Sequence, residues 1–247
     1  MRISVLGGCG AWPAAGEACS GYLVEHDGFA LLVDPGYATL PRLLRQLRAD
    51  DVDAVLVSHG HPDHCADLHP LLRARAYGDG SPPPLPVYAL PGALDPVLAL
   101  DGVARQPGTV QVNEISPGQR LGIGPFGVDS WLLPHFVPNL GLRLTAGGRV
   151  LAYTGDTGPS PDVTELARGA DLFLAEATFP EEVTGNDPRY LSTARQAGQY
   201  AAAAGAGQLM LTHLWPGTSR AAALAAARPA FGGEITVAAG GVAVDLS

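Results

Sequence analysis

The chain has 247 residues, of which 47% are hydrophobic and 16% charged, and its formal net charge is −9. This composition is typical of a folded protein that buries a substantial core, and no apolar run approaches the roughly 20 residues needed to span a bilayer. The acidic balance argues against a general nucleic-acid surface, which would show a basic stripe. All fifteen basic residues are arginine, which excludes a Schiff-base lysine and a P-loop lysine.

The first residues, MRISVLGG, carry one arginine followed by an alternating apolar run. This pattern is typical of a first β-strand and not of a signal peptide, which has a longer apolar stretch and a cleavage site. The three cysteines, Cys9, Cys19 and Cys65, include no CxxC pair, so no disulfide framework is expected. We therefore expect a cytoplasmic protein with no membrane partner.

Apolar runs rich in β-branched residues and bounded by Gly, Pro and Asp predict strands along the whole chain. In chain order these are Ile3–Leu6, Gly21–Glu25, Ala30–Val33, Ala54–Ser58, Val87–Ala89, Val128–Leu133, Gly141–Leu144, Val150–Thr154, Leu172–Ala175, Gln208–Thr212 and Ile235–Ala238. Helical patterns lie between some of them, at Leu40–Arg48, Ala66–Ala76, Asp162–Arg168, Thr193–Ala204 and Ser219–Ala227. Two regions are expected to be irregular: Gly78–Pro86, because of its proline content, and Asp101–Gly118.

The order of the predicted elements indicates the architecture. The first half opens with strands and then alternates strand and helix, and the second half repeats this plan from about Gln119. This order favours an α/β fold in which two sheets pack together with helices outside, an αβ/βα sandwich. We expect a single domain over residues 1–247 with two pseudo-symmetric halves, about 1–118 and 119–247.

A cluster of polar residues, SHGHPDHCADL, follows the predicted strand Ala54–Ser58. His59 and His61 alternate, so an extended backbone points both the same way, while Asp63 and His64 are adjacent and can face a second point. Imidazole and carboxylate groups together suit Zn²⁺, Mn²⁺ or Fe. A lone histidine is more often a surface or hydrogen-bonded residue, so the interpretation depends on finding further ligands.

Further ligands do follow other predicted strands. WLLPH ends a strand at His135, VLAYTGDTG ends one at Asp156, and LMLTH ends one at His213. Five of the seven histidines are thereby placed at strand ends, where α/β proteins usually carry functional groups. Asp67 is either an acceptor for a ligand histidine or a helix N-terminal carboxylate.

The pattern HxHxDH, then a separate His, a GD after a strand and a late TH after a strand, resembles the metallo-β-lactamase superfamily over nearly the whole chain. The resemblance implies a four-layer αβ/βα sandwich of metallo-β-lactamase type and two divalent metals about 3.5 Å apart that activate a water between them. Zinc is expected, with manganese or iron as alternatives. The implied ligands are His59, His61 and His135 for one metal, Asp63, His64 and His213 for the other, and Asp156 as the bridge. Asp63 would also orient the nucleophile.

Three segments resemble the ribonuclease Z-like branch of this superfamily. They are HFVPNLGLRL, GADLFLAEATF and the segment that runs from LSTARQ to THLWPGTSR. Within the branch, SHGHPDHCADL and THLWPGTSR look like the short bacterial cyclic-nucleotide phosphodiesterases. The resemblance therefore implies a metal-dependent hydrolase of a small phosphodiester such as a 3′,5′-cyclic nucleotide. Related proteins often pair, so a homodimer is one alternative. The tRNA 3′-processing members carry a long protruding arm, for which this chain has little room between His135 and Asp156, so an extended nucleic-acid substrate is not expected.

One position departs from the branch pattern. A histidine there usually pairs with the Glu of EATF, here Glu176, and the two are thought to help protonate the leaving oxygen. Tyr190 stands at the matching position, in PRYLST. A phenol with a pKa near ~10 is a poor acid at neutral pH, but it can still donate a hydrogen bond to the substrate. Glu176 and Tyr190 are thus candidate catalytic residues beside Asp63.

This departure keeps other functions open. A carboxylic-ester, lactone or amide hydrolase would use the same site. A protein of another class, which binds metal without catalysis or uses iron for redox chemistry, is a further alternative. Arg143 follows the His135 motif and is either a contact for an anionic substrate or an ordinary surface arginine on a strand.

Overall fold

The computed structural model describes residues 1–102, 108–183 and 188–247. Within these residues the strands form two sheets of seven strands each. In spatial order the first sheet consists of β14 (Ala243–Asp245), β1 (Arg2–Gly7), β2 (Gly21–His26), β3 (Phe29–Val33), β4 (Ala54–Leu56), β5 (Leu85–Ala89) and β6 (Val110–Glu114). The second consists of β13 (Glu234–Val237), β12 (Gln208–Thr212), β11 (Leu172–Glu176), β10 (Arg149–Tyr153), β9 (Asn139–Ala146), β8 (Phe126–Leu133) and β7 (Arg120–Ile123).

Both sheets change from antiparallel to parallel pairing along their length. Strands β14, β1, β2 and β3 pair antiparallel, and β3 to β6 pair parallel. Strands β7 to β10 pair antiparallel, and β10 to β13 pair parallel. The carboxyl ends of parallel strands meet at one edge of a sheet, so residues that follow β3, β4, β10, β11 and β12 are brought to the same end of the molecule.

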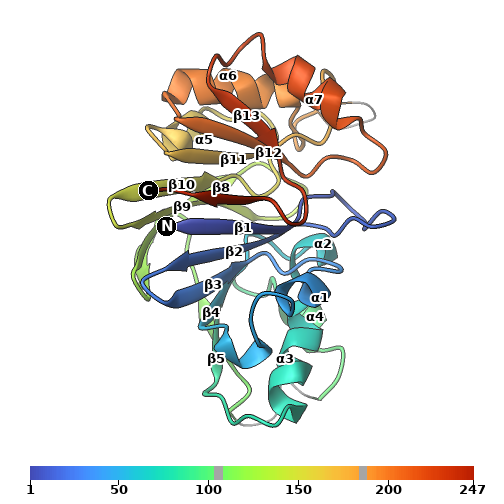
Figure 1. Cartoon of the computed structure of the whole chain (residues 1–247), viewed down its shortest axis with the longest axis vertical. Helices are drawn as coiled ribbons and strands as arrows, with labels where there is room; N and C mark the ends of the chain where they lie inside the picture. Colours follow the sequence, from blue (N-terminus) through green and yellow to red (C-terminus); the bar gives the residue numbers. More distant parts are fainter. Residues whose placement is uncertain (103–107, 184–187) are drawn as a thin grey trace.

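The two sheets face each other and helices cover their outer faces, which gives four layers (Figure 1). A central core fills the space between the sheets, and a separate core lies under the helices on each side. The helices of the first half are α1 (Leu40–Leu43), α2 (Pro62–Cys65), α3 (Leu68–Tyr77) and α4 (Asp95–Leu98). Those of the second half are α5 (Pro161–Ala167), α6 (Ala194–Ala204) and α7 (Arg220–Ala227). The expected four-layer αβ/βα sandwich is confirmed.

Strands in the middle of each sheet are apolar on both faces. In β2, Tyr22 and Val24 belong to the central core while Leu23 belongs to the core under the helices. In β11, Leu172 and Leu174 face the central core while Phe173 packs under α5 and α6. A strand covered on both faces needs continuous rather than alternating hydrophobicity, and such runs are what the sequence shows.

Several predicted boundaries were wrong, each for a local reason. The helix expected at Leu40–Arg48 stops at Leu43, because the next amides, of Arg45 and Gln46, bond three residues back to Arg42 and Leu43 as in a turn. The expected loop Gly78–Pro86 ends two residues early, since β5 starts at Leu85.

The irregular region expected at Asp101–Gly118 contains a strand. Residues 103–107 lie outside the described part of the chain, and β6 occupies Val110–Glu114. Like β7 and β14, which the sequence also failed to predict, β6 is the end strand of a sheet. End strands are flanked on one side only and carry polar residues, so they lack a strong hydrophobic pattern.

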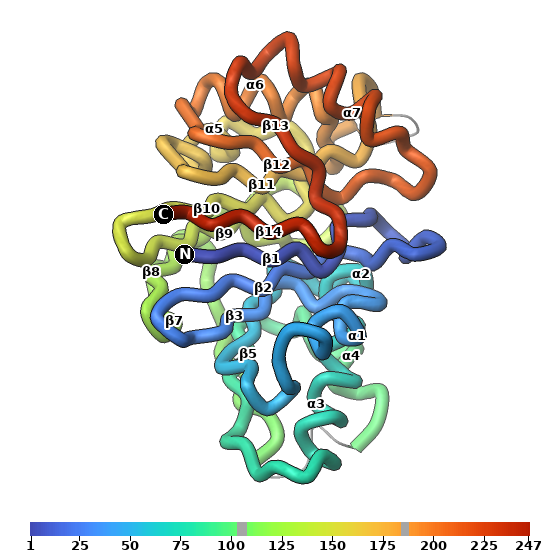
Figure 2. Tube along the Cα trace, in the orientation of Figure 1, coloured from blue at the N-terminus to red at the C-terminus, as the bar shows by residue number. Residues whose placement is uncertain are grey.

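The chain ends close to where it begins. Strand β14 runs antiparallel beside β1, and Figure 2 shows both termini at the same end of the molecule. The last strand of the chain therefore belongs to the sheet built by the first half. Among the described residues, no helix is both long enough and apolar enough to cross a membrane.

Helix α6 begins with a reciprocal cap between Thr193 and Gln196. The Thr193 hydroxyl accepts from the Gln196 amide at 3.1 Å, and the Gln196 side chain accepts from the Thr193 amide at 2.9 Å. We expect Thr193→Ala to lower the free energy of unfolding by about 1 kcal/mol, because an amide of the first turn loses its acceptor. Denaturant unfolding followed by circular dichroism measures this, with Thr193→Ser as the control that keeps the hydroxyl. Equal loss in both variants would show that the methyl group, and not the cap, stabilises the helix.

Candidate metal centre

The segment after β4 presents its polar side chains in two directions. His61 is extended, with φ −68° and ψ 141°, and Pro62 follows it as the first residue of α2. Proline suits this position because its ring fixes φ near the helical value, and the N–H that it lacks would have no partner within the helix. The extended stretch carries His59 and His61, and the single helical turn carries Asp63 and His64. This change from extended to helical backbone explains how four residues that are close in the sequence can contribute to two different groups of potential metal ligands.

The structure gathers the seven predicted metal ligands into two groups that share one carboxylate. The first group is His59, His61, His135 and Asp156, and the second is Asp63, His64, Asp156 and His213. In each group the potential ligand atoms all lie within 4.8 Å of one another.

In the first group, His61 Nδ1 lies 3.1 Å from both His59 Nε2 and His135 Nε2. Asp156 Oδ2 lies 3.7 Å from the same Nε2 atoms of His59 and His135. Three imidazole nitrogens and a carboxylate oxygen thus surround one point, which matches the preference of Zn²⁺ for four N and O ligands.

In the second group, His213 Nε2 lies 3.1 Å from both Asp63 Oδ2 and Asp156 Oδ2. His64 Nε2 lies 3.2 Å from Asp156 Oδ1 and 3.6 Å from Asp63 Oδ2. Asp156 is 2% exposed and directs its two oxygens to different imidazoles. Asp156 therefore belongs to both groups.

Four of the five imidazoles make a hydrogen bond through Nδ1, the ring nitrogen that does not face the site. His59 Nδ1 lies 3.0 Å from the Ser58 hydroxyl, His64 Nδ1 lies 2.8 Å from Asp34, His135 Nδ1 donates to the Tyr190 carbonyl at 2.9 Å, and His213 Nδ1 lies 3.0 Å from the Thr178 hydroxyl. Such contacts set the ring orientation and leave Nε2 directed into the site, as is usual for metal-binding histidines.

Asp34 is a supporting residue that the sequence analysis did not predict. It follows β3, is fully buried, and its carboxylate accepts from the Ser58 amide at 2.7 Å, the Ser58 hydroxyl at 2.6 Å and the Tyr153 hydroxyl at 2.7 Å, besides meeting His64. The available signal was an aspartate directly after the apolar run ALLV, the same signal that identified Asp156. Asp67, which was considered for this role, instead accepts from the Leu40 amide at the start of α1.

The electrostatics of the site separate its histidines. Burial lowers the pKa of His59, His61 and His135, so these imidazoles are neutral and suited to bind a cation. Burial also acts against protonation of His64 and His213, but the negative charges of Asp156 and Asp63 outweigh it and raise the pKa of both rings. Although burial raises the pKa of Asp156, the surrounding imidazoles hold it well below its usual value. The carboxylate is therefore ionised.

The donor set fits a pair of divalent cations. His64 Nε2 and Asp156 Oδ1 are buried and, despite their proximity, make no hydrogen bond of acceptable geometry. Buried polar atoms without a partner are costly, and a cation coordinated by both would remove that cost. Imidazole and carboxylate are also the ligands that zinc, manganese and iron share.

Glu176 and Tyr190 lie near the site but in different surroundings. Glu176 ends β11, is 1% exposed, and accepts from the Thr157 amide, the Thr178 hydroxyl and the Ser192 amide. Burial, followed by the negative charge of Asp156, raises its pKa to about 8. The hydrogen bonds of Glu176 within the described residues do not reach Tyr190, whose ring lies 4.9 Å from that of Phe136, centroid to centroid.

Arg143 lies away from the strand ends. It stands in the middle of β9, between Leu142 and Leu144, which face the central core, so its side chain is on the helix side of the sheet. Its guanidinium donates to the Leu166 carbonyl at 2.8 Å. Of the two alternatives for Arg143, the structural one is supported. Cys65 is buried and its thiol contacts the His61 carbonyl, which agrees with a packing role.

Comparison with known proteins places this geometry in a family. Residues 30–214 match the family model described as "Beta-lactamase superfamily domain". The chain is 32% identical to the probable metallo-hydrolase YhfI of Bacillus subtilis over 98% of each chain, and the crystal structure of YhfI superimposes with a TM-score of 0.88 over 98% of each chain. A ribonuclease Z of Kineococcus radiotolerans is 29% identical over 86% of this chain and 82% of its own. The short form of human tRNase Z has the same fold, with a TM-score of 0.82 over the whole of both chains at 22% identity.

Asp34 supplies the next prediction. We expect Asp34→Asn to weaken zinc binding about 10–100-fold, because His64 loses the carboxylate that orients its ring and increases its basicity. Competition with a chromogenic chelator measures the affinity. Asp53→Asn is the matched control, since Asp53 accepts from the Ala30 amide at the opposite end of β3. Wild-type affinity in Asp34→Asn, with the control also unchanged, would remove Asp34 from the metal centre.

Proposed function

We propose that this chain, which belongs to the beta-lactamase superfamily, is a dinuclear metallohydrolase of a small phosphodiester such as a 3′,5′-cyclic nucleotide. Its membership of this superfamily and its similarity to a probable metallo-hydrolase identify the protein as a metal-dependent hydrolase. The observation that carries the proposal is the pair of ligand groups joined by the buried carboxylate of Asp156. Zinc is the expected metal, with manganese and iron as alternatives.

The double site suits phosphodiester chemistry. Two divalent cations would supply Lewis-acid stabilisation of both the attacking and the leaving oxygen of an in-line displacement. His59, His61 and His135 would hold one cation, Asp63, His64 and His213 the other, with Asp156 between them. Asp63 would accept a hydrogen bond from the attacking water. Its Oδ2 is held at 2.8 Å by the Ala11 amide and at 3.1 Å by His213.

Glu176 and Tyr190 take separate parts in this proposal. Glu176 joins the backbone of Thr157, next to Asp156, to Thr178, which supports His213. These contacts favour a positioning role for the Glu176 carboxyl. Tyr190 is half-buried and its backbone supports His135. Its hydroxyl is our candidate donor to an oxygen of the substrate.

The fold around the site favours a small substrate over tRNA. Between His135 and Asp156, where the tRNA-processing enzymes are expected to carry their arm, β9 and β10 form a tight hairpin joined by Gly147 and Gly148. The formal charge of −9 also opposes binding of an extended polyanion. Both features support a substrate smaller than tRNA for this chain, while the proposed metal chemistry would be shared with its ribonuclease Z relatives.

The direct test is turnover of 3′,5′-cyclic AMP by protein loaded with Zn²⁺ or Mn²⁺. We expect hydrolysis to 5′-AMP, lost in Asp156→Ala together with bound metal by elemental analysis, because both ligand groups lose their shared oxygen donor. Asp95→Ala, an exposed carboxylate in α4, is the control and should keep both metal and turnover. No hydrolysis by fully metallated protein would overturn the phosphodiester proposal, and turnover of a carboxylic ester, lactone or amide would then identify the alternative.

Tyr190→Phe tests the hydroxyl alone, since the ring and the backbone contact to His135 remain. We expect kcat to fall about 10–100-fold, the effect of losing one hydrogen bond to a charged group, with KM little changed. Steady-state kinetics on the cyclic nucleotide measure both constants. Unchanged kcat would mean that the Tyr190 hydroxyl takes no part in turnover.

A further inference from the structure

A cavity of about 510 Å³ lies where the loop after β1 meets α1 and α7. Its charged lining residues are three arginines, Arg42, Arg45 and Arg220, and one carboxylate, Glu17. We call it the arginine pocket. None of the candidate metal ligands is among its described lining residues. The cavity therefore carries an excess of positive charge, apart from the metal centre, in a chain whose formal net charge is −9.

Arg42, in α1, is held in place by neutral groups. Its Nη1 donates to the Leu6 carbonyl at 2.9 Å, and its Nη2 donates to the Gly16 carbonyl. A Cβ atom at Gly240 would overlap Nη1, so glycine at this position leaves the space that the guanidinium occupies. Carbonyl oxygens satisfy the donors but do not cancel the charge. Arg42 is thus a positioned cation with no carboxylate bonded to it in the part of the chain that the structure describes.

Arg45 is the second cation of the pocket and is available to a ligand. It lies in the turn after α1, where its amide bonds back to the Arg42 carbonyl, and its side chain is exposed. Within residues 1–102, 108–183 and 188–247, its guanidinium makes no hydrogen bond or ion pair. All five N–H donors of this group can therefore be offered to an acceptor in the cavity.

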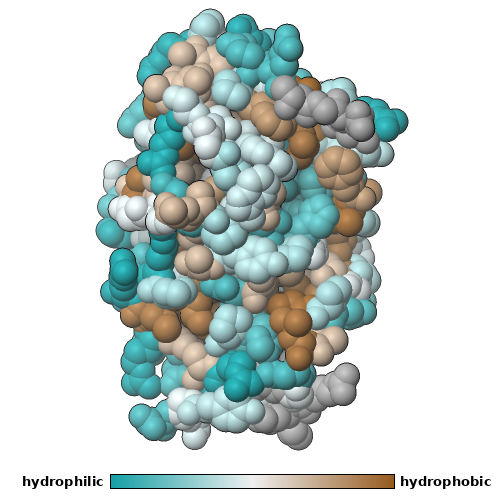
Figure 3. All heavy atoms as spheres, turned by 90° about the vertical axis from the view of Figure 1, so that its right-hand side faces the viewer, coloured by the Kyte–Doolittle hydropathy of each residue, from teal (hydrophilic) through white to brown (hydrophobic). Residues whose placement is uncertain are grey.

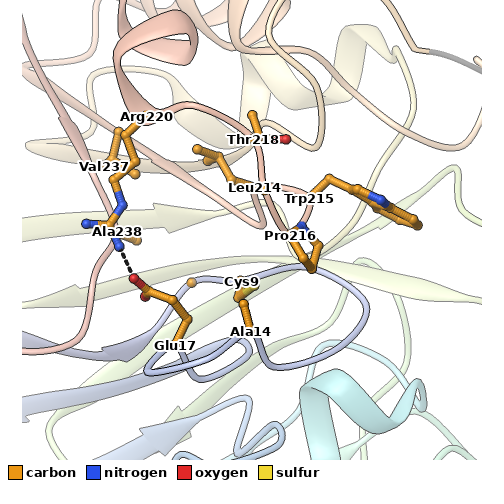
Figure 4. Close-up of a pocket in the computed structure, with 12 residues that line it drawn as sticks. Cys9, Ala14, Glu17, Leu214, Trp215, Pro216, Thr218, Arg220, Val237 and Ala238 are labelled. Atoms are coloured by element: carbon orange, nitrogen blue, oxygen red, sulfur yellow. Dashed lines mark hydrogen bonds and ion pairs between the residues drawn. The ribbon is translucent and has the colours of Figure 1, made fainter.

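The third cation, Arg220, has one partner that a ligand can replace. Arg220 begins α7 and Glu17 lies in the loop after β1, and Figure 4 shows the two side chains pointing toward each other. Arg220 Nη2 lies 2.5 Å from Glu17 Oε1, and the side chains are 50% and 36% exposed. Ion pairs this exposed contribute little to stability. An anion in the pocket can therefore compete with Glu17 for the guanidinium.

The size and chemistry of the pocket suit a small phosphorylated molecule. Guanidinium groups bind phosphate oxygens through paired, charge-assisted hydrogen bonds, and small-molecule pockets usually have roughly 300–1,000 Å³. Figure 3 shows the side of the molecule on which the loop after β1 and α7 lie in Figure 1. Hydrophilic and hydrophobic residues are mixed over the coloured part of this face, without the continuous apolar patch typical of a protein partner.

We propose that the arginine pocket binds a phosphate group, free or carried by a small molecule, at a site separate from the metal centre. Arg42 and Arg45 approach the phosphate from α1 and the turn that follows it, and Arg220 approaches it from α7. Glu17 competes with the phosphate for Arg220. The proposal goes beyond the phosphodiesterase function and does not depend on it.

Isothermal titration calorimetry of the zinc-loaded protein tests this, with inorganic phosphate, ribose 5-phosphate and uncharged ribose as probes at low ionic strength, where screening is weak. We expect Arg45→Gln and Arg220→Gln each to weaken binding of the phosphate probes about 10-fold, because a charge-assisted hydrogen bond is lost. Glu17→Gln should instead tighten binding, because Arg220 loses its competing carboxylate. Arg168→Gln, which breaks the exposed pair of Arg168 with Glu165 on α5, is the matched control and should bind as the wild type does.

A second comparison separates the pocket from the metal centre, where phosphate is also expected to bind. Asp156→Ala, which removes the oxygen donor shared by both ligand groups, should keep the binding that depends on Arg45. If this variant does not fold, the zinc-loaded arginine variants decide alone: they should lose one phosphate-binding event while elemental analysis shows unchanged zinc.

Opposite changes in Glu17→Gln and Arg220→Gln support the site, and the probe that binds more tightly distinguishes free phosphate from a phosphorylated ligand. Three results would overturn it: phosphate affinity unchanged in Arg45→Gln and Arg220→Gln, weaker binding in Glu17→Gln, or binding of uncharged ribose as tight as that of ribose 5-phosphate.

Discussion

The buried carboxylate of Asp156 is the contact on which the site depends. Its two oxygens meet four imidazoles, those of His59, His64, His135 and His213, at 3.1 to 3.7 Å. An ionised group in such surroundings would be expensive unless compensated. Here the imidazoles provide the compensation, and bound divalent cations would add to it. The ends of β4, β8, β10 and β12 must therefore hold their positions closely, which makes the rigidity of both sheets part of the function.

The sheets provide that rigidity through their cores. Central strands such as β2 and β11 are buried on both faces, and close-packed interiors tolerate little displacement. The imidazoles are then fixed a second time by hydrogen bonds to Ser58, Asp34, Thr178 and the Tyr190 carbonyl. Candidate metal ligands at strand ends, supported by residues of neighbouring strands, form a preorganised site. Substrate choice can consequently vary in the surrounding loops without disturbing the centre.

The loops around the metal centre differ in character. On one side, Phe136 and Tyr190 stand next to His135. On the other, Trp12 packs edge-on against Trp215, which lines a cavity together with Glu17 and Arg220. Because Trp12 and Asp63 are linked through the Ala11 amide, a ligand that contacts Trp12 also bears on a proposed metal ligand.

The sequence by itself predicted the two-sheet sandwich and the seven residues that the structure brings together in two groups able to hold a metal ion. Continuous apolar runs followed by His or Asp can be recognised locally, because a buried strand and the polar residues after it are neighbours in the sequence. It did not predict the end strands β6, β7 and β14, whose polar residues are held by pairing with a distant neighbour. Nor did it predict that Asp34 supports His64, or that Tyr190 meets Phe136 while Glu176 bonds to Thr157, Thr178 and Ser192. These contacts join residues from different strands and loops, and only tertiary packing decides which side chains come together.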